Sequence, residues 1–371
     1  MLAWYRRRAR VLPWRESKDP YAIWVSEVML QQTQVATVIP YFARFVRDFP
    51  TVRQLAHAPQ ERVLKLWSGL GYYRRARNLH CTAQQLMRER GGQFPRDERE
   101  LRALPGVGKY TARAILSIAY NLPCFVLEGN VTRVVARLRA LRGNPSTSDY
   151  RREIERHLDQ LLSRRSPGDF NQALMELGQT VCLPRTPRCP ACPLRTWCLA
   201  YRAQDPEAYP AARPRRKAET RYLATAVIRR HNKVALVRGL DEGLLTDLWN
   251  FPAAFGHSRA EALDRLAARL KKVTACSLRR GSCMAELTHG ITYRFIRVLL
   301  YSAEVIGTPR NPSLRWFPLR QLERQAVSQL ARKIATNFRQ APKPGSPGHS
   351  TRPAGGPTHA QGRTPSISAL E

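Results

Sequence analysis

Acidic residues are scarce in this 371-residue chain, which holds 28 aspartates and glutamates against 62 lysines and arginines. The net charge is +34 at pH 7, and the isoelectric point is about 11.0. A surface this basic binds polyanions, because counterions released from phosphates favour the complex. We therefore expect nucleic acid to be the partner. A basic protein that merely adheres to DNA is the alternative that charge alone leaves open.

Long apolar runs are also missing, so the sequence predicts no membrane span. Met1 is followed by Trp4, Tyr5 and three arginines rather than by the apolar core of a signal peptide. We expect a cytoplasmic protein of bacterial type, associated with the nucleoid.

Cysteines are few, and only half of them are clustered. Single, buried free thiols are expected at Cys81, Cys124, Cys276 and Cys283. The spacing C-x6-C-x2-C-x5-C joins Cys182, Cys189, Cys192 and Cys198. Four thiolates at this spacing are enough for one iron–sulfur cluster. A zinc site, which usually has two short cysteine pairs, and disulfides in a secreted protein are the alternatives.

The chain is long enough for two domains, each with its own core. Between about residues 20 and 198, apolar residues recur every three or four positions, as in 23–33 and 131–141. This pattern predicts an all-α domain over residues 1–199. The Pro- and Arg-rich residues 200–220 suit an interdomain linker that follows a phosphate backbone.

Residues 221–340 predict a small α+β domain. Strands are expected near 222–227, 234–237 and 294–301, where β-branched and aromatic residues gather, and a helix is expected at 260–271. Residues 341–371 are rich in Pro, Gly, Ser and Thr and cannot bury enough surface to fold. We expect them to form a disordered tail.

A glycine turn, LPGVGKYTA at residues 104–112, leads into a predicted helix at 112–119. Backbone N–H groups at Gly106, Val107, Gly108 and Lys109 form a natural phosphate site. We interpret the segment as a helix–hairpin–helix, which grips one DNA strand without reading its sequence. An ordinary connection between helices is the alternative.

Glu27 lies among apolar neighbours on a predicted helix. Desolvation there raises a carboxyl pKa and keeps a proton available near neutrality, as a general acid requires. The alternative is a solvated surface glutamate.

The hairpin and the cysteine spacing together resemble the iron–sulfur branch of the helix–hairpin–helix DNA glycosylases. Within that branch, WVSEVMLQQTQ at 24–34 and GLGYY at 69–73 resemble the adenine DNA glycosylases of the MutY type, which remove adenine mispaired with 8-oxoguanine. The likeness covers roughly residues 4–198 and, more loosely, the C-terminal domain. It implies one [4Fe-4S] cluster and, as partner, double-stranded DNA containing A:8-oxoguanine or A:G mispairs. We also expect a monomer.

The resemblance makes Glu27 the acid that protonates the departing adenine, while a second carboxylate stabilises the oxocarbenium-like sugar. The family has Asp before Gly-Asn-Val, but this chain has Glu128. The longer side chain adds one C–C bond, about 1.5 Å, and misplacement of that size can cost about 100-fold in rate. We hypothesise that Glu128 works; a slowed or altered enzyme is the alternative.

The resemblance also assigns Tyr110, which stands where relatives with lyase activity carry lysine. Without an amine no Schiff base forms easily, which implies a monofunctional glycosylase that leaves an abasic site. Asn130 is expected to be a turn or orienting residue.

The target base must leave the duplex before it is cut. By resemblance, Gln31 and Tyr72 fill the stack around the lesion, and Gln32 beside them belongs to the same substrate-binding set. The adenine pocket is implied at Trp14, Arg15, Leu30 and Gln172. Core packing is the alternative for the apolar and aromatic members. Phosphate contacts beside the cluster are expected from Arg185, Arg188 and Arg195, with the cluster chiefly a structural clip.

The C-terminal domain resembles the Nudix-like domain that adenine glycosylases use to recognise oxidised guanine, with LWNFP at 248–252 as an early strand. Its helix holds only Glu261 and Asp264 instead of a magnesium-binding run of glutamates, so phosphohydrolase activity is not expected. The recognition loop is expected to use His289, Thr292 and Tyr293, where Thr292 supplies a hydroxyl. A mismatch glycosylase for another base, such as thymine opposite guanine, and a catalytically impaired mismatch-binding protein are the alternatives.

Overall fold

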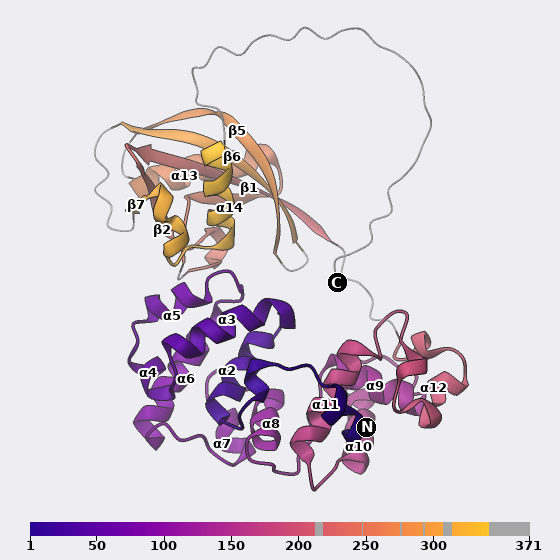
Figure 1. Cartoon of the computed structure of the whole chain (residues 1–371). Helices are drawn as coiled ribbons and strands as arrows, with labels where there is room; N and C mark the ends of the chain where they lie inside the picture. Colours follow the sequence, from indigo (N-terminus) through magenta and orange to yellow (C-terminus); the bar gives the residue numbers. More distant parts are fainter. Residues whose placement is uncertain (212–217, 247, 275–276, 292–293, 307–313, 341–371) are drawn as a thin grey trace, which may run out of the picture.

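The computed structural model describes residues 1–211, 218–246, 248–274, 277–291, 294–306 and 314–340. A helical domain and a sheet-containing domain follow one another along the chain (Figure 1). The all-α plus α+β arrangement predicted from the sequence is therefore confirmed. None of the helices in these ranges combines the length and the apolar character that crossing a bilayer would take.

The helical domain consists of α1 (Leu2–Arg8), α2 (Pro20–Leu30), α3 (Val35–Asp48), α4 (Val52–His57), α5 (Gln60–Trp67), α6 (Arg74–Arg90), α7 (Glu98–Arg102), α8 (Lys109–Ile118), α9 (Gly129–Arg139), α10 (Ser148–Leu161), α11 (Pro167–Thr180) and α12 (Leu199–Arg202).

Helix α2 is part of the larger apolar cluster of this domain, to which it contributes residues such as Trp24 and Met29. The Asp19 side chain caps its first turn by accepting a hydrogen bond from the Tyr21 N–H, and Pro20 occupies a first-turn position where its missing N–H costs nothing. Apolar residues surround the helix on every side, with Trp24 and Met29 fully buried, as expected of a core helix.

Two apolar clusters form the helical domain, and α8 contributes to both. Ile115 belongs to the cluster that contains Trp24 and Phe45, whereas Ala114 belongs to the cluster built on Val135 and Ile154 of α9 and α10. Because α8 packs into both, it sets the distance between α2 on one side and α9 and α11 on the other.

The C-terminal domain contains β1 (Glu219–Arg230), β2 (Lys233–Arg238), β3 (Trp249–Asn250), β4 (Ala253–Gly256), α13 (Arg259–Thr274), β5 (Ser277–Ile291), β6 (Arg294–Ile306), β7 (Leu314–Pro318) and α14 (Gln329–Gln340). The main strand order is β3-β2-β1-β6-β5, with β4 paired to β1 and β7 to β2. Strands β1 and β6 run parallel, and the other paired strands are antiparallel.

Alternation along β1 sends its side chains to opposite faces of the sheet. Leu223 and Val227 share a cluster with Ile334 of α14, whereas Ala224 and Ile228 share one with Leu266 of α13. The sheet is thus covered by one helix on each face (Figure 1). The sequence predicted the positions of β1, β2, β6 and α13, but it did not predict β5, β7 or α14.

The linker predicted at 200–220 starts later in the structure than the sequence suggested. Helix α12 packs on α9, and Ala200 is fully buried. The backbone carbonyl of Tyr209 accepts a hydrogen bond from Arg137 Nε at 3.0 Å, so ordered structure continues to that point. The expected tail, 341–371, and part of the linker, 212–217, lie outside the described residues.

The two domains are in direct contact. Leu248 and Ala326 of the C-terminal domain are buried in the same cluster as the core of α2. Ser68 Oγ donates to the Val327 carbonyl at 3.0 Å, and Arg332 Nη2 donates to Ser68 Oγ at 2.8 Å. These contacts place the C-terminal domain beside the turn at residues 69–73.

Gly168 tests the close packing of α11 on α8. A Cβ at this position would lie 2.6 Å from the Ser117 backbone oxygen, so Gly168→Ala must push the helices apart. We expect a loss of about 1–3 kcal/mol in the free energy of unfolding, measured by urea denaturation. Gly108→Ala, with open space around its Cβ, is the matched control. Equal stabilities of the two variants would contradict the tight packing.

Candidate active site

A cleft of about 780 Å³ opens between α2 and the pair α9 and α11. Both predicted carboxyl groups, Glu27 and Glu128, line it. The other predicted residues that the structure brings to the same cleft are Trp14, Arg15, Leu30, Gln32, Tyr110, Asn130 and Gln172. Residues that are up to 158 positions apart in the sequence, Trp14 and Gln172, therefore meet around one space.

Glu27 projects from α2 with 5% of its surface exposed, so it is not a solvated surface glutamate. The Tyr110 hydroxyl donates a hydrogen bond to Glu27 Oε2 at 2.7 Å and also lies 3.2 Å from Met175 Sδ. Burial raises the pKa of Glu27 to about 7; the Tyr110 hydrogen bond opposes this shift, and the nearby Glu128 charge adds to it.

Tyr110 keeps its own proton. Burial, together with the charge of Glu27, raises the pKa of its phenol well above the usual value. The hydroxyl is therefore a fixed donor that holds the Glu27 side chain in the cleft.

Glu128 occupies the N-cap of α9. Its Oε1 accepts a hydrogen bond from the Val131 N–H at 2.9 Å, and its Oε2 accepts from the Asn130 N–H at 2.9 Å and from Asn130 Nδ2 at 3.1 Å. Burial raises the pKa of Glu128, while these hydrogen bonds and the charge of Arg133 act to lower it. The extra carbon of the side chain is accommodated by folding the carboxylate back onto the helix N-terminus.

Arg133 connects this carboxylate to the cysteine loop. Its Nη2 donates to Asn130 Oδ1 at 2.7 Å and to the Gly178 carbonyl at 2.8 Å, and its Nε donates to the Cys182 carbonyl at 2.8 Å. The side chain that orients Glu128 is thereby tied to the backbone of the first clustered cysteine.

Arg137, one turn further along α9, also holds the cysteine loop. Its guanidinium donates to the carbonyls of Leu183 at 2.6 Å and Pro184 at 2.8 Å, and its Nη1 lies 3.4 Å from Cys182 Sγ. The phosphate-binding candidates Arg185, Arg188 and Arg195 are exposed on this loop.

One small cavity with apolar walls is lined by all four clustered cysteines: Cys182, Cys189, Cys192 and Cys198. Four thiols converging on one space fit the donor set of an iron–sulfur cluster. Within the described ranges, no three Cys, His, Asp or Glu side chains lie close enough together to ligate a single metal ion.

Glu176 is a functional candidate that the sequence reading missed. It is 1% exposed and binds Arg10 Nε at 2.7 Å and Arg15 Nη2 at 2.9 Å, so it fixes two cations that line the cleft. Burial alone would raise its pKa, but the two arginines outweigh burial and the pKa is lowered. The sequence feature that could have indicated a buried, paired acid is the position of Glu176 within the apolar run at residues 173–177 of α11.

A second cavity, of about 450 Å³, lies between the domains. From the helical domain it is lined by Gln31, Gln32 and Tyr72. From the C-terminal domain it is lined by residues 243–246 and Leu248. Tyr72 is 45% exposed and has a φ of +48°. This cavity brings the predicted stack-filling residues together, away from the carboxyl groups.

His289 is not among the residues that line the interdomain cavity. It lies on β5, where burial and the charge of Lys333 on α14 lower its pKa. Its predicted companions, Thr292 and Tyr293, lie outside the described residues. The recognition loop thus stays a prediction.

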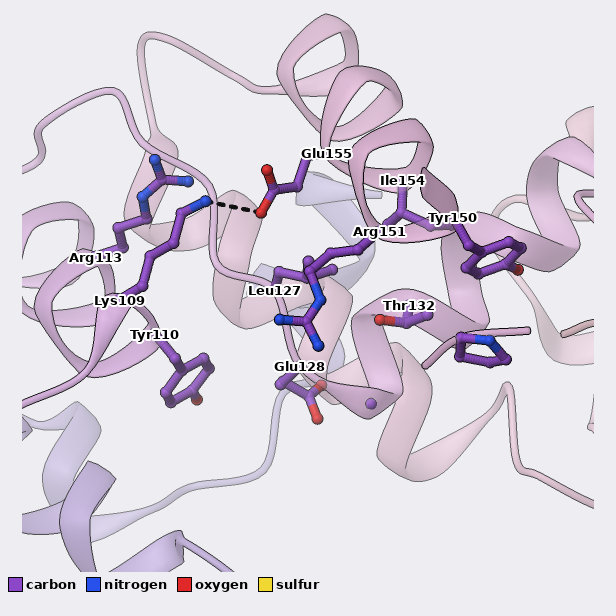
Figure 2. Close-up of a pocket in the computed structure, with 12 residues that line it drawn as sticks. Lys109, Tyr110, Arg113, Leu127, Glu128, Thr132, Tyr150, Arg151, Ile154 and Glu155 are labelled. Carbon is purple, nitrogen blue, oxygen red and sulfur yellow. Dashed lines mark hydrogen bonds and ion pairs between the residues drawn. The ribbon is translucent and has the colours of Figure 1, made fainter. Parts of the chain in front are cut away.

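The predicted hairpin forms the turn between α7 and α8, in which Gly106 has a φ of +76° and Gly108 caps α8. Lys109 Nζ binds Glu155 at 2.8 Å. A further cavity of about 260 Å³ lies at this turn, and Glu128 is among the residues that line it. Figure 2 shows these residues. The hairpin and the carboxylate therefore lie side by side.

The chain is similar to several known proteins. Residues 25–160 match the model of the HhH-GPD superfamily base excision DNA repair proteins. The adenine DNA glycosylase of Mus musculus is 35% identical, over 90% of this chain and 76% of its own length. The enzyme of the same name from Buchnera aphidicola subsp. Acyrthosiphon pisum is 30% identical, over 92% of this chain and 97% of its own. A thermostable thymine-DNA glycosylase structure matches with a TM-score of 0.49 at 26% identity, covering 54% of this chain and 93% of that one.

The environment of Glu27 predicts a stability difference that depends on pH. Its pKa is about 7 when folded against 4.5 for a free side chain, so the folded protein holds the extra proton between these values. The parent should therefore lose up to about 3 kcal/mol of unfolding free energy as pH rises through this window. Glu27→Gln cannot ionise and should gain that amount relative to the parent at pH 8.

Urea denaturation of both proteins at pH 4.5 and pH 8 measures this difference. A gap between parent and Glu27→Gln that does not change with pH would contradict the raised pKa.

Proposed function

The chain belongs to the adenine DNA glycosylases, and from this premise we propose that it hydrolyses the N-glycosidic bond of adenine mispaired with 8-oxoguanine or guanine. The single observation that carries the proposal is the shared cleft of Glu27 and Glu128, two carboxyl groups held in different environments. Pairs of titratable groups with such contrasting environments divide the roles of acid and base between them.

Glu27 supplies the proton. With a pKa of about 7 it is half protonated at neutral pH, and its carboxyl can protonate a ring nitrogen of an adenine in the cleft. Protonation turns the purine into a better leaving group. The bond between the base and the sugar then breaks, with its electron pair leaving on the base.

Glu128 stabilises the sugar cation that this cleavage leaves. Its carboxylate is held by two backbone N–H groups and the Asn130 amide, so little reorganisation is needed as positive charge develops. Addition of water to the cation completes hydrolysis and gives an abasic site. Tyr110 has a phenol in place of an amine, which supports a monofunctional enzyme.

The walls of the cleft suit an extruded base. Trp14 offers an aromatic surface, and Arg15, fixed by Glu176, presents a guanidinium beside Leu30 and Gln172. Base flipping places the target between apolar and aromatic side chains and reads its polar edge by hydrogen bonds. We propose that Gln31 and Tyr72, which line the interdomain cavity, enter the base stack around the lesion.

We also propose that the four clustered cysteines hold one [4Fe-4S] cluster, which when bound ties the loop at 182–198 into one unit. Arg133 and Arg137 already bind the backbone of this loop, and Arg133 reaches Asn130 beside Glu128. The sequence spacing, in which only Cys189 and Cys192 form a short pair, supports a cluster over zinc, since zinc sites usually have two such pairs.

Base excision is tested with duplexes containing A:8-oxoguanine, A:G or T:G pairs, followed by alkaline cleavage of abasic sites. We expect strand scission for the two adenine pairs only, and only after alkali. Glu27→Gln should lower the single-turnover rate by about 100- to 10,000-fold because the acid is lost, and Glu128→Gln should nearly abolish excision. Glu128→Gln as fast as the parent, or tight mismatch binding without any abasic product, would refute the proposal.

The single-turnover rate should depend on pH through Glu27. The acid must be protonated, so the rate should fall as pH rises through about 7. Rates from pH 5.5 to 9 at saturating enzyme measure the midpoint. A rate that stays level up to pH 9 would exclude Glu27 as the proton donor.

The cluster is tested by analysis of iron and acid-labile sulfide in protein purified without added metal. We expect about four of each per chain. Cys189→Ser should lower both contents and loosen the loop, seen as faster proteolysis after its arginines. Zinc in place of iron would contradict the cluster.

A further inference from the structure

Arg75, in the first turn of α6, is a buried cation. It is 8% exposed, and no Asp or Glu among the described residues forms an ion pair with it. Burial lowers the pKa of its guanidinium to about 10. Such a charge is expensive to bury unless hydrogen bonds replace its water.

Backbone carbonyls supply those hydrogen bonds from two separate segments. On one side, Nη1 donates to the carbonyls of Val28 at 3.0 Å and Met29 at 2.8 Å, and also to that of Gln31. These carbonyls belong to the C-terminal end of α2, where the helix itself has no N–H donors left for its last carbonyl groups. Glu27 lies in this same last turn, and Thr33 Oγ1 just beyond it accepts from Nη2 at 3.1 Å.

On the other side, Nη2 donates to the carbonyls of Leu70 and Gly71, each at 3.3 Å. These residues form the turn that presents Tyr72, and the guanidinium carbon lies 5.4 Å from the centre of the Tyr72 ring. Tyr72 in this turn has a φ of +48°, a conformation that a non-glycine residue keeps only when its surroundings fix it.

We infer that Arg75 is a positioning residue that holds the end of α2, which carries Glu27, and the turn that presents Tyr72 in one fixed relation. The inference rests on the proposed function, in which Tyr72 enters the base stack while Glu27 protonates the extruded adenine. The planar guanidinium of Arg75 then sets the distance between Tyr72 and Glu27. A nucleotide displaced from the stack at Tyr72 is therefore positioned with its base next to the Glu27 carboxyl.

Lysine cannot reproduce this arrangement. A guanidinium presents five donors in a planar fork, whereas an ammonium has three on a flexible stem. Arg75→Lys keeps the charge and most of the volume but cannot bridge both segments. The matched control is Leu86→Val, a loss of packing about three turns further along the same helix, where Leu86 is fully buried.

The test compares the parent, Arg75→Lys and Leu86→Val by single-turnover excision of adenine opposite 8-oxoguanine across pH. We expect Arg75→Lys to lose about 100-fold in rate, because displacement of a catalytic group by about 1 Å costs that much. Its pH midpoint should fall below that of the parent, since water reaches Glu27 when the end of α2 loosens. Leu86→Val should keep the midpoint and nearly all of the rate.

Hydrogen–deuterium exchange of the full-length proteins gives a second readout that does not need activity. In Arg75→Lys, exchange should rise together in residues 28–33 and 69–73. Thr33→Val removes only one acceptor and should change both segments in the same direction to a smaller extent, which keeps the test available if Arg75→Lys does not fold.

The outcomes are distinguishable. A parent that excises no adenine refutes the proposed function, while exchange in the two segments still decides the linkage. An active parent with an Arg75→Lys variant that matches Leu86→Val in rate, pH midpoint and exchange overturns the role of Arg75 alone. A rise in only one of the two segments also overturns it.

Discussion

The proposed chemistry depends on two carboxyl groups, Glu27 and Glu128, that line one cleft in different surroundings. Glu27 is buried among core residues, and this burial disfavours its charged form more than the hydrogen bond from Tyr110 favours it. Glu128 sits on the N–H groups of α9, which favour its charged form against burial. In the proposed mechanism, these different surroundings rather than the residue type divide the roles of acid and electrostatic stabiliser between the two glutamates.

Arginine–carbonyl hydrogen bonds hold this arrangement in place. Arg75 fixes the end of α2, Arg133 joins Asn130 to the cysteine loop, and Arg137 holds the loop itself. A guanidinium bound to carbonyls avoids bringing further acids into the core, where they would disturb the pKa of Glu27. The arginines of this chain therefore stabilise its interior as well as its basic surface. The few acids have different partners: Tyr110 for Glu27, Asn130 for Glu128, and Arg10 and Arg15 for Glu176.

Motifs in the sequence predicted the centre of the site well because they lie on single elements. Glu27 falls on a helix made mostly of apolar residues, and Glu128 precedes the glycine that starts α9. Glu176 with Arg10 and Arg15, and the carbonyl ligands of Arg75, were beyond prediction because their partners lie on other elements. Likewise, the amphipathic pattern of α14 could be interpreted only with the sheet that this helix covers. The predicted start of the linker at residue 200 was too early because Ala200 and Tyr209 pack on α9.

The most direct test of the account is the titration of the Glu27 carboxyl itself, followed by carbon-13 NMR of glutamate-labelled protein and assigned with Glu27→Gln. The account predicts that this resonance titrates near pH 7. A Glu27 carboxyl that titrates at its ordinary value near 4.5 would contradict it, since no proton would then be held for the departing base.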